Sequence, residues 1–163
     1  MMLRKLIVMM AALALIVGCA ELQPARRDAQ QEFTYDYSVP GAGKDALWTR
    51  ARDYFAGAYG DSKEVMRVMD QSDGVILGKG LAAWGGFGTE CHTAYHIRFA
   101  AKDQKARLQL ELIYGAPPLS KCTGWHWPTE HGYGQIVAQF NNLATALGSA
   151  LSGHGVSDRL KNF

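Results

Sequence analysis

Two neighbouring segments, residues 91–101 and 105–114, constrain the fold most tightly, because both alternate between apolar and polar side chains. That period of two is typical of strands with one buried face. Pairing Lys102 with Lys105 across a short turn sets a register that can be checked against side-chain polarity. The register places three apolar pairs on one face: Tyr95 with Leu112, Ile97 with Leu110, and Phe99 with Leu108. The two segments therefore predict an antiparallel hairpin that covers a core.

The opposite face of the same hairpin is polar. His96 falls directly opposite Glu111, and Arg98 lies diagonal to that carboxylate. A carboxylate between two potential cations could form a polar binding spot, or an acid/base pair if it is desolvated. Ordinary cross-strand charge pairing on a solvated face explains the same residues, and we favour that interpretation.

The rest of the chain supplies strands and helices in the order β-α-β-β-β-β-α. Alternation predicts a strand at 33–39, and two shorter β segments are expected at 64–70 and 75–81. Apolar spacing predicts one helix from Lys44 to about Tyr59, with Leu47, Ala51, Phe55 and Ala58 on one face. A second helical stripe runs from about Tyr133 through Ile136, Phe140, Leu143, Leu147 and Leu151.

Two stretches are predicted to be irregular. The glycine-rich segment 82–90 is interpreted as a loop, and prolines interrupt segment 116–132. The expected fold is α+β, with an antiparallel sheet of about five strands and two helices on one face. The domain is expected to span 32–152, followed by a flexible tail at 153–163.

The N-terminus resembles a bacterial lipoprotein signal peptide over residues 1–18. Arg4 and Lys5 precede an uninterrupted apolar run at 6–17, which is too short for an ordinary membrane-spanning helix. Ile16-Val17-Gly18-Cys19 looks like a lipobox. The resemblance implies an acylated Cys19 and a tether through residue 31, whereas a plain signal peptide or an uncleaved anchor would leave that cysteine unmodified.

The compartment follows from that resemblance. Ala20 stands where Asp would signal inner-membrane retention, so the protein is expected on the outer membrane, facing the periplasm. Several acyl chains hold a protein stably on a membrane without a spanning helix. The only charged residues before Cys19 are Arg4 and Lys5, so the rest of the chain has 15 basic and 15 acidic side chains. A neutral domain gives no electrostatic reason to bind nucleic acid.

The other two cysteines, Cys91 and Cys122, are expected to form a disulfide in an oxidising periplasm. Metal binding is the competing interpretation, with His92, His126 and His131 as further ligands. The Cys–His spacings match no zinc signature, so we favour the disulfide and expect no metal or other cofactor.

Four sequence motifs resemble a family of bacterial secreted proteins and lipoproteins that carries a domain of unknown function. The resemblance covers roughly residues 32–115, and its motifs are FTYDYSVPG at 33–41, KDALW at 44–48, SKEV at 62–65 and GVILGKG at 74–80. It implies a fold like that of the TATA-binding protein (TBP-like) and no agreed activity. Fold likeness alone does not imply DNA binding.

Aromatic residues near glycines form the other candidate binding site. Trp84 and Phe87 lie in the first predicted loop, and Trp125, His126 and Trp127 lie in the second. Exposed tryptophans would suit an envelope protein, a peptide or a glycan, whereas buried ones would cap the core.

Catalytic signatures such as G-x-S-x-G and H-E-x-x-H are missing from the sequence. We therefore interpret the chain as a non-enzymatic binding module of the cell envelope, with an unidentified partner. One alternative is self-association through the open sheet face. Another is a hydrolase or metal protein that uses His96, Glu111, His126 or the cysteines.

Overall fold

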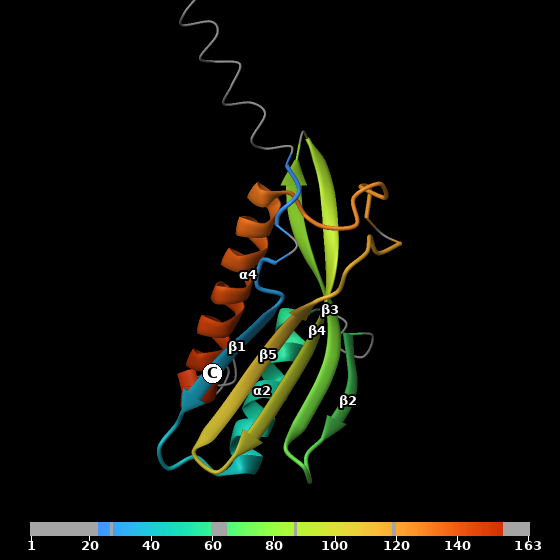
Figure 1. The fold of residues 1–163 in the computed structure, drawn as a ribbon. Helices are drawn as coiled ribbons and strands as arrows, with labels where there is room; N and C mark the ends of the chain where they lie inside the picture. The colour runs from blue at the N-terminus through green and yellow to red at the C-terminus, as the bar shows by residue number, and fades with distance from the viewer. Residues whose placement is uncertain (1–22, 27, 60–64, 87, 119, 155–163) are drawn as a thin grey trace, which may run out of the picture.

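The computed structural model describes all residues except 1–22, 27, 60–64, 87, 119 and 155–163. Cys19, Phe87 and the end of the expected tail lie outside the described residues. The elements, in chain order, are β1 (Glu32–Ser38), α2 (Lys44–Ala58), β2 (Met66–Asp70), β3 (Val75–Gly86), β4 (Thr89–Lys102), β5 (Lys105–Leu112), α4 (Glu130–Ser149) and the π-helical turn η2 (Ala150–His154). The α+β class and the β-α-β-β-β-β-α order are confirmed (Figure 1).

The five strands form one antiparallel sheet in the order β1-β5-β4-β3-β2. The hairpin of β4 and β5 has the predicted register, with Lys102 opposite Lys105 and Tyr95 opposite Leu112. Residues Ile97, Leu108 and Leu110 on its apolar face are fully buried, and Phe99 is nearly so. The alternation identified the register because a slip of one residue would expose this entire set.

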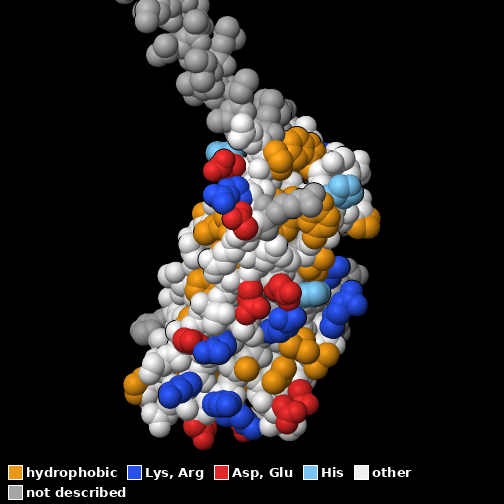
Figure 2. Space-filling model, in the orientation of Figure 1, with side chains coloured by type: hydrophobic (Ala, Val, Ile, Leu, Met, Phe, Trp, Pro, Cys, Tyr) orange, Lys and Arg blue, Asp and Glu red, His pale blue; other side chains and the backbone are white. Residues whose placement is uncertain are grey.

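Helices α2 and α4 cover one face of the sheet, and the other face is open (Figure 1). In α2 the predicted stripe is buried at Leu47, Ala51 and Phe55, but Ala58 is exposed because it ends the helix. The core between the layers contains edge-to-face aromatic pairs, including Phe55 with Phe99 at 6.2 Å between ring centroids. Over the open face, acidic and basic side chains are interspersed (Figure 2).

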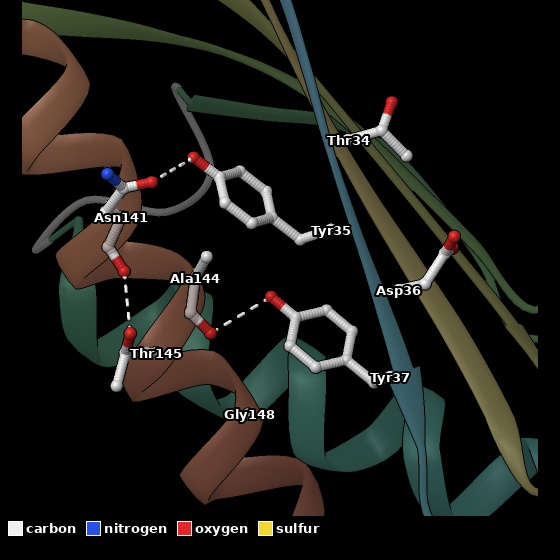
Figure 3. A pocket seen from close by; sticks show the side chains of 8 residues that line it. All are labelled: Thr34, Tyr35, Asp36, Tyr37, Asn141, Ala144, Thr145 and Gly148. Carbon is white, nitrogen blue, oxygen red and sulfur yellow. Dashed lines mark hydrogen bonds between the residues drawn. The ribbon is translucent and has the colours of Figure 1, made fainter.

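Helix α4 packs against the edge strand β1 through two tyrosines. The hydroxyl of Tyr35 donates to Asn141 Oδ1 at 2.9 Å, and that of Tyr37 donates to the carbonyl of Ala144 at 3.0 Å (Figure 3). Burial raises the pKa of both phenols, so they remain protonated donors at neutral pH. These bonds fix the distance between the sheet edge and the helix.

The prediction of a loop at 82–90 is wrong for most of that segment. Strand β3 continues to Gly86 and β4 begins at Thr89, with pairs from Leu81 opposite Ala94 to Gly86 opposite Thr89. Neither β2 nor β5 pairs with this stretch. We call it the β3–β4 arm (residues 81–86 and 89–94), and it projects beyond the other strands in Figure 1. The prediction failed because a glycine-rich composition is typical of loops.

A glycine also makes room at the base of the arm. A Cβ atom on Gly80 would lie 2.4 Å from the ring of Tyr95 on the paired strand. The ring therefore lies directly over the glycine backbone, and its hydroxyl contacts that of Tyr59 at 2.8 Å. The glycine is a packing requirement in a strand rather than a turn signal.

The second helix begins three residues earlier than predicted, at Glu130. Thr129 caps it, because its side chain accepts a hydrogen bond from the backbone N–H of Gly132. The described part of the expected tether also contacts this region. Ala25 is buried, its N–H donates to the carbonyl of Pro128, and Pro24 pairs with Thr129. Residues 24–25 are therefore packed on the folded body, where a free spacer was expected.

Candidate functional site

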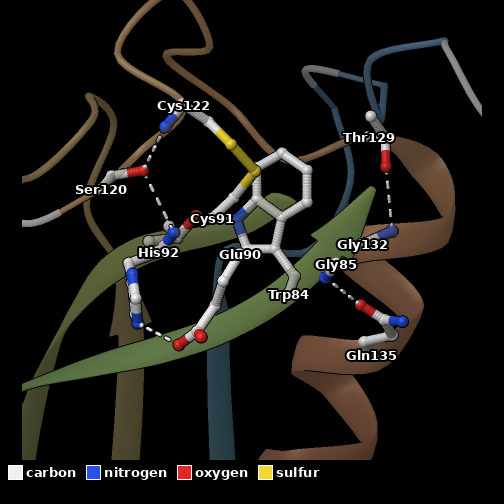
Figure 4. Close-up of a disulfide and its surroundings, with 11 residues drawn as sticks. Trp84, Gly85, Glu90, Cys91, His92, Ser120, Cys122, Thr129, Gly132 and Gln135 are labelled. Carbon is white, nitrogen blue, oxygen red and sulfur yellow. Dashed lines mark hydrogen bonds and ion pairs between the residues drawn. A yellow bond between two sulfur atoms is a disulfide. The ribbon is translucent and has the colours of Figure 1, made fainter. Parts of the chain in front are cut away.

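A disulfide joins Cys91 of the arm to Cys122 of the long segment between β5 and α4, as the sequence predicts (Figure 4). The two Cα atoms are 5.2 Å apart, and 31 positions separate the cysteines in the chain. Ser120 supports the same junction, since its hydroxyl accepts from the N–H groups of His92 and Cys122, both at 3.2 Å. The arm and the segment are thus joined covalently and by hydrogen bonds.

Trp84 lies beside the disulfide and is buried within the arm (Figure 4). Its indole N–H donates to Thr93 Oγ1 at 3.0 Å, and its ring packs on α4 at Gly132. A Cβ atom at Gly132 would lie 2.5 Å from Trp84 Cε3, so only glycine permits this contact. The tryptophan is therefore a core residue of the arm, so its predicted place in a loop is wrong, and its burial matches the alternative that it caps the core.

Two glutamines of α4 cover the outer edge of the arm. Gln135 accepts from the N–H of Gly85 at 2.7 Å, and Gln139 donates to the carbonyl of Ala83. These bonds replace the ones that a further strand would make. Unpaired strand edges invite aggregation, and covering them with side chains removes that hazard.

Two aromatic side chains, Tyr114 and His126, are exposed at this end of the molecule. Tyr114 is the second residue after β5 and is 58% exposed, while its ring stacks against His126 at 5.9 Å and against Trp127 at 6.1 Å. A backbone bond from the N–H of Gly115 to the carbonyl of His126, at 2.9 Å, holds the two segments together. We call the exposed pair Tyr114 and His126 the aromatic shelf.

The other predicted aromatic residues divide between the core and its margin. Trp127 is 6% exposed and supports the shelf from the core side, and its indole N–H has no acceptor among the described residues. Trp125 is half-buried against the core. Phe87 lies outside the described residues. Among the described members of the predicted aromatic set, only His126 is well exposed, because the tryptophans have sheet and helix surface to cover.

Sequence reasoning missed Tyr114. It extends the buried series Leu108, Leu110 and Leu112 by one more step of two residues, and that pattern predicts a core position. Gly115, with a φ of +120°, turns the chain away immediately after it. The position of the glycine before two prolines was the available signal that the strand ends here.

The predicted polar cluster on the open face is assembled. Glu111 Oε2 lies 2.8 Å from Arg98 Nη2 and 3.6 Å from His96 Nδ1. The three side chains are 38–47% exposed, so solvent screens their interaction. This geometry matches ordinary cross-strand charge pairing better than a desolvated acid/base pair.

Neighbouring pairs extend that pattern to the edge strand. Arg107 binds Asp36 through two hydrogen bonds of 2.6 and 2.9 Å, and Gln109 donates to Glu32 at 2.9 Å. The Arg107 guanidinium lowers the pKa of the Asp36 carboxyl, mainly through that hydrogen bond. The carboxylates of Asp36 and Glu111 on this half of the open face are thus each paired with an arginine.

The other half of the open face, over β2 and β3, has exposed apolar side chains. Val68, Leu77 and Leu81 are 45%, 36% and 42% exposed, and Val68 lies directly opposite Leu77 in the pairing. We call these three residues the apolar patch. It is a second candidate contact surface, at the opposite side of the sheet from β1.

In the part of the chain that the structure describes, no three His, Cys, Asp or Glu side chains are placed to hold one metal ion. Thiolate ligation by Cys91 and Cys122 would require reduction of their disulfide first. Among the described helices, none combines the length and hydropathy needed to cross a bilayer.

Comparisons with known proteins yield likenesses of fold alone. No protein-family model and no curated protein matches the sequence. The crystal structure of a DUF4468 family protein from Bacteroides ovatus is similar over 80% of this chain and 90% of its own, with 12% identity and a TM-score of 0.54. That of a TBP-like protein from Parabacteroides distasonis aligns over 85% and 93%, with 10% identity and a TM-score of 0.49. This chain therefore shares the fold of a domain of unknown function.

Proposed function

We propose that this protein is a lipid-anchored binding module of the bacterial outer membrane that faces the periplasm and holds an envelope component on the aromatic shelf. The observation that carries the proposal is the exposed ring of Tyr114, stacked on His126 and Trp127. It is a large aromatic surface that folding leaves uncovered. Contact sites in proteins are enriched in such residues.

The surroundings of the shelf favour binding because they hold it still. The disulfide, the Gly115–His126 backbone bond and the ring stacking all restrict the segments that bear the two side chains. A preorganised aromatic surface loses little conformational entropy when a ligand covers it. A binding role therefore fits the shelf better than catalysis, which would need a nucleophile or an activated acid/base pair.

The membrane anchor is supported by the sequence. A basic start, a short apolar run and Gly18-Cys19 occur in the order that lipoprotein signals require. Membrane fractionation and metabolic labelling with palmitate test this part, with Cys19→Ser as the control. We expect label on the wild-type protein and none on the variant, and an unlabelled wild-type protein would overturn the anchor.

Binding at the shelf is tested by site-specific crosslinking in cells. A photoreactive benzoylphenylalanine at position 114 should yield a defined adduct with the full-length lipidated protein. The same group at Lys105, an exposed position far from the arm, serves as the matched control. Unlabelled wild-type protein should compete the adduct away, whereas a Tyr114→Ala/His126→Ala competitor should not. Equal adducts from both positions, or none, would contradict the proposal.

Self-association through the sheet is the second candidate function, and the apolar patch favours it. Three exposed apolar side chains on a pleated surface could bury one another in a dimer. Sedimentation of the full chain in detergent tests this. A dimer that dissociates in the Leu77→Lys variant would favour self-association over binding at the aromatic shelf. A monomer at all concentrations would exclude self-association.

A further inference from the structure

Strand β1 is one edge of the sheet, and half of its backbone groups point away from β5. The Gln31 carbonyl accepts from Leu112, and the Val39 N–H donates to Gln104, which identifies the odd-numbered positions as those bonded to β5. In an antiparallel pair these positions alternate with ones that face outward. The N–H and C=O of Thr34 and Asp36 therefore point away from β5, to the edge of the sheet on which no other described strand lies; we call it the free edge.

A groove follows this free edge. It has a volume of about 550 Å³ and lies between β1 and α4 (Figure 3). The strand contributes the four residues Thr34 to Tyr37, and the helix contributes Asn141, Ala144, Thr145 and Gly148. Tyr35 and Tyr37 extend from the strand to the helix, so their rings lie between the two walls.

We propose that this groove binds an extended peptide, which adds to β1 as a sixth strand and rests one side on α4. Backbone bonds to Thr34 and Asp36 would give affinity, and alternate side chains of the peptide would contact the helix. This inference concerns a different surface from the aromatic shelf and stands independently of the proposed function.

A second copy of the chain fits the same edge poorly. Tyr35 and Tyr37 hold α4 directly against β1. In an antiparallel twofold pair the two β1 strands would lie about 4.8 Å apart, with both copies of α4 on the same side. Packed helices need about 8–10 Å between their axes, so these two helices would collide. A peptide without its own helix avoids this clash.

The lining of the groove indicates the chemistry of the peptide. Helix α4 has no Asp, Glu, Lys or Arg from His131 to Ser149. The carboxylate of Asp36, on the strand side, is already bound by Arg107. An ionic side chain on the peptide would thus be desolvated against the helix without a partner. We expect uncharged residues at the positions that face α4, small enough to fit beside Thr145 and Gly148.

The experiment is a selection from a display library of random linear dodecapeptides on the full chain, purified in detergent. Enriched peptides are then measured against two pairs of variants. Thr34→Pro removes a backbone N–H that points away from β5, and an edge strand tolerates proline at such a position. Thr34→Val is its control, because valine keeps the N–H. Thr145→Arg fills the groove, and Ala146→Arg adds the same side chain at an exposed position outside it.

We expect affinity to fall at least about tenfold in Thr34→Pro and Thr145→Arg and to change little in the two controls. Bound peptide should also slow hydrogen exchange at the amides of Thr34 and Asp36. Should Thr34→Pro fail to fold, the Thr145/Ala146 pair still decides the outcome. No enriched peptide, equal binding to Thr145→Arg and Ala146→Arg, or a dimer that protects the same two amides would overturn the proposal.

Discussion

The five-stranded layer and the β3–β4 arm share two strands, yet different interactions stabilise them. In the layer, apolar side chains such as Phe55, Phe99 and Leu108 are buried between the sheet and two helices. The arm has only two strands, and a two-stranded ribbon is marginally stable by itself. It is held by a disulfide, by the buried Trp84–Thr93 hydrogen bond and by glutamines on its edge. The exposed aromatic shelf adjoins the region that depends on cross-links.

This contrast has a physical reason. A ligand surface must remain uncovered, so the region that presents it has less apolar area to bury than an ordinary core. In such a region the disulfide and hydrogen bonds, rather than buried apolar area, supply the rigidity. Substitutions in the core of the layer should therefore destabilise the whole domain, whereas substitutions in the arm should increase local unfolding of the arm alone.

The largest effect is expected from the layer. Phe99→Ala removes a buried ring that packs on Phe55, and we expect a loss of about 3–5 kcal/mol in the free energy of unfolding. Urea unfolding measures this value, with Phe99→Leu as a milder control. A loss below about 1 kcal/mol would mean that the layer does not depend on this core.

Removal of the disulfide should come next. Its loop of 31 positions predicts a contribution of about 3–4 kcal/mol from the entropy of the unfolded chain. We expect Cys91→Ala/Cys122→Ala to lower the free energy of unfolding by up to that amount. The wild-type protein in reductant is the control, since it should match the variant. Unchanged stability in both would indicate that hydrogen bonds and packing suffice for the arm.

A pair of glycines in α4 separates packing in the arm from helix propensity. Gly132→Ala would force a methyl group into Trp84, and overpacking of this kind costs about 1–3 kcal/mol. Gly134→Ala has no heavy atom within 4 Å of its new Cβ, so the same change should stabilise the helix by about 0.5–1 kcal/mol. Thermal unfolding compares the two variants. Shifts of the same sign would disprove the close contact.

The smallest effect concerns the junction of the layer and the arm, where Tyr59 and Tyr95 share a partly buried hydrogen bond. Burial raises the pKa of both phenols. In the unfolded chain they ionise near pH 10, so their contribution is complete below about pH 10 and is lost as the pH rises further. Tyr59→Phe should cost about 0.5–1.5 kcal/mol at pH 7 and flatten the decline between pH 10 and 11. An unchanged slope would contradict the assignment.

The sequence could predict the layer because its constraints are local. One buried face forces strict alternation on β4 and β5, so the register of Tyr95 and Leu112 follows from polarity alone. The stripes of α2 and α4 follow from helical spacing in the same way, apart from Ala58 at a helix end. The disulfide could be predicted because Cys91 and Cys122 are the two cysteines that remain after Cys19, and an oxidising periplasm was assumed.

The β3 half of the arm, residues 82–86, could not be predicted, because its contacts join distant parts of the chain. Trp84 is buried through Gly132, and the edge at Gly85 is completed by Gln135. Neither relation has a signal within a short window of sequence. The exposure of Tyr114 likewise depends on where Gly115 turns the chain, so the candidate shelf became visible only in three dimensions.

Native-state hydrogen exchange by mass spectrometry tests the central claim most directly, with the full chain compared in its oxidised form and as Cys91→Ala/Cys122→Ala. The claim is that the disulfide holds the arm and the aromatic shelf while the layer is independent of it. We predict faster exchange confined to residues 81–94 and 113–128, with unchanged protection across residues 95–110. A uniform increase over the whole sheet, or no change in the arm, would contradict it.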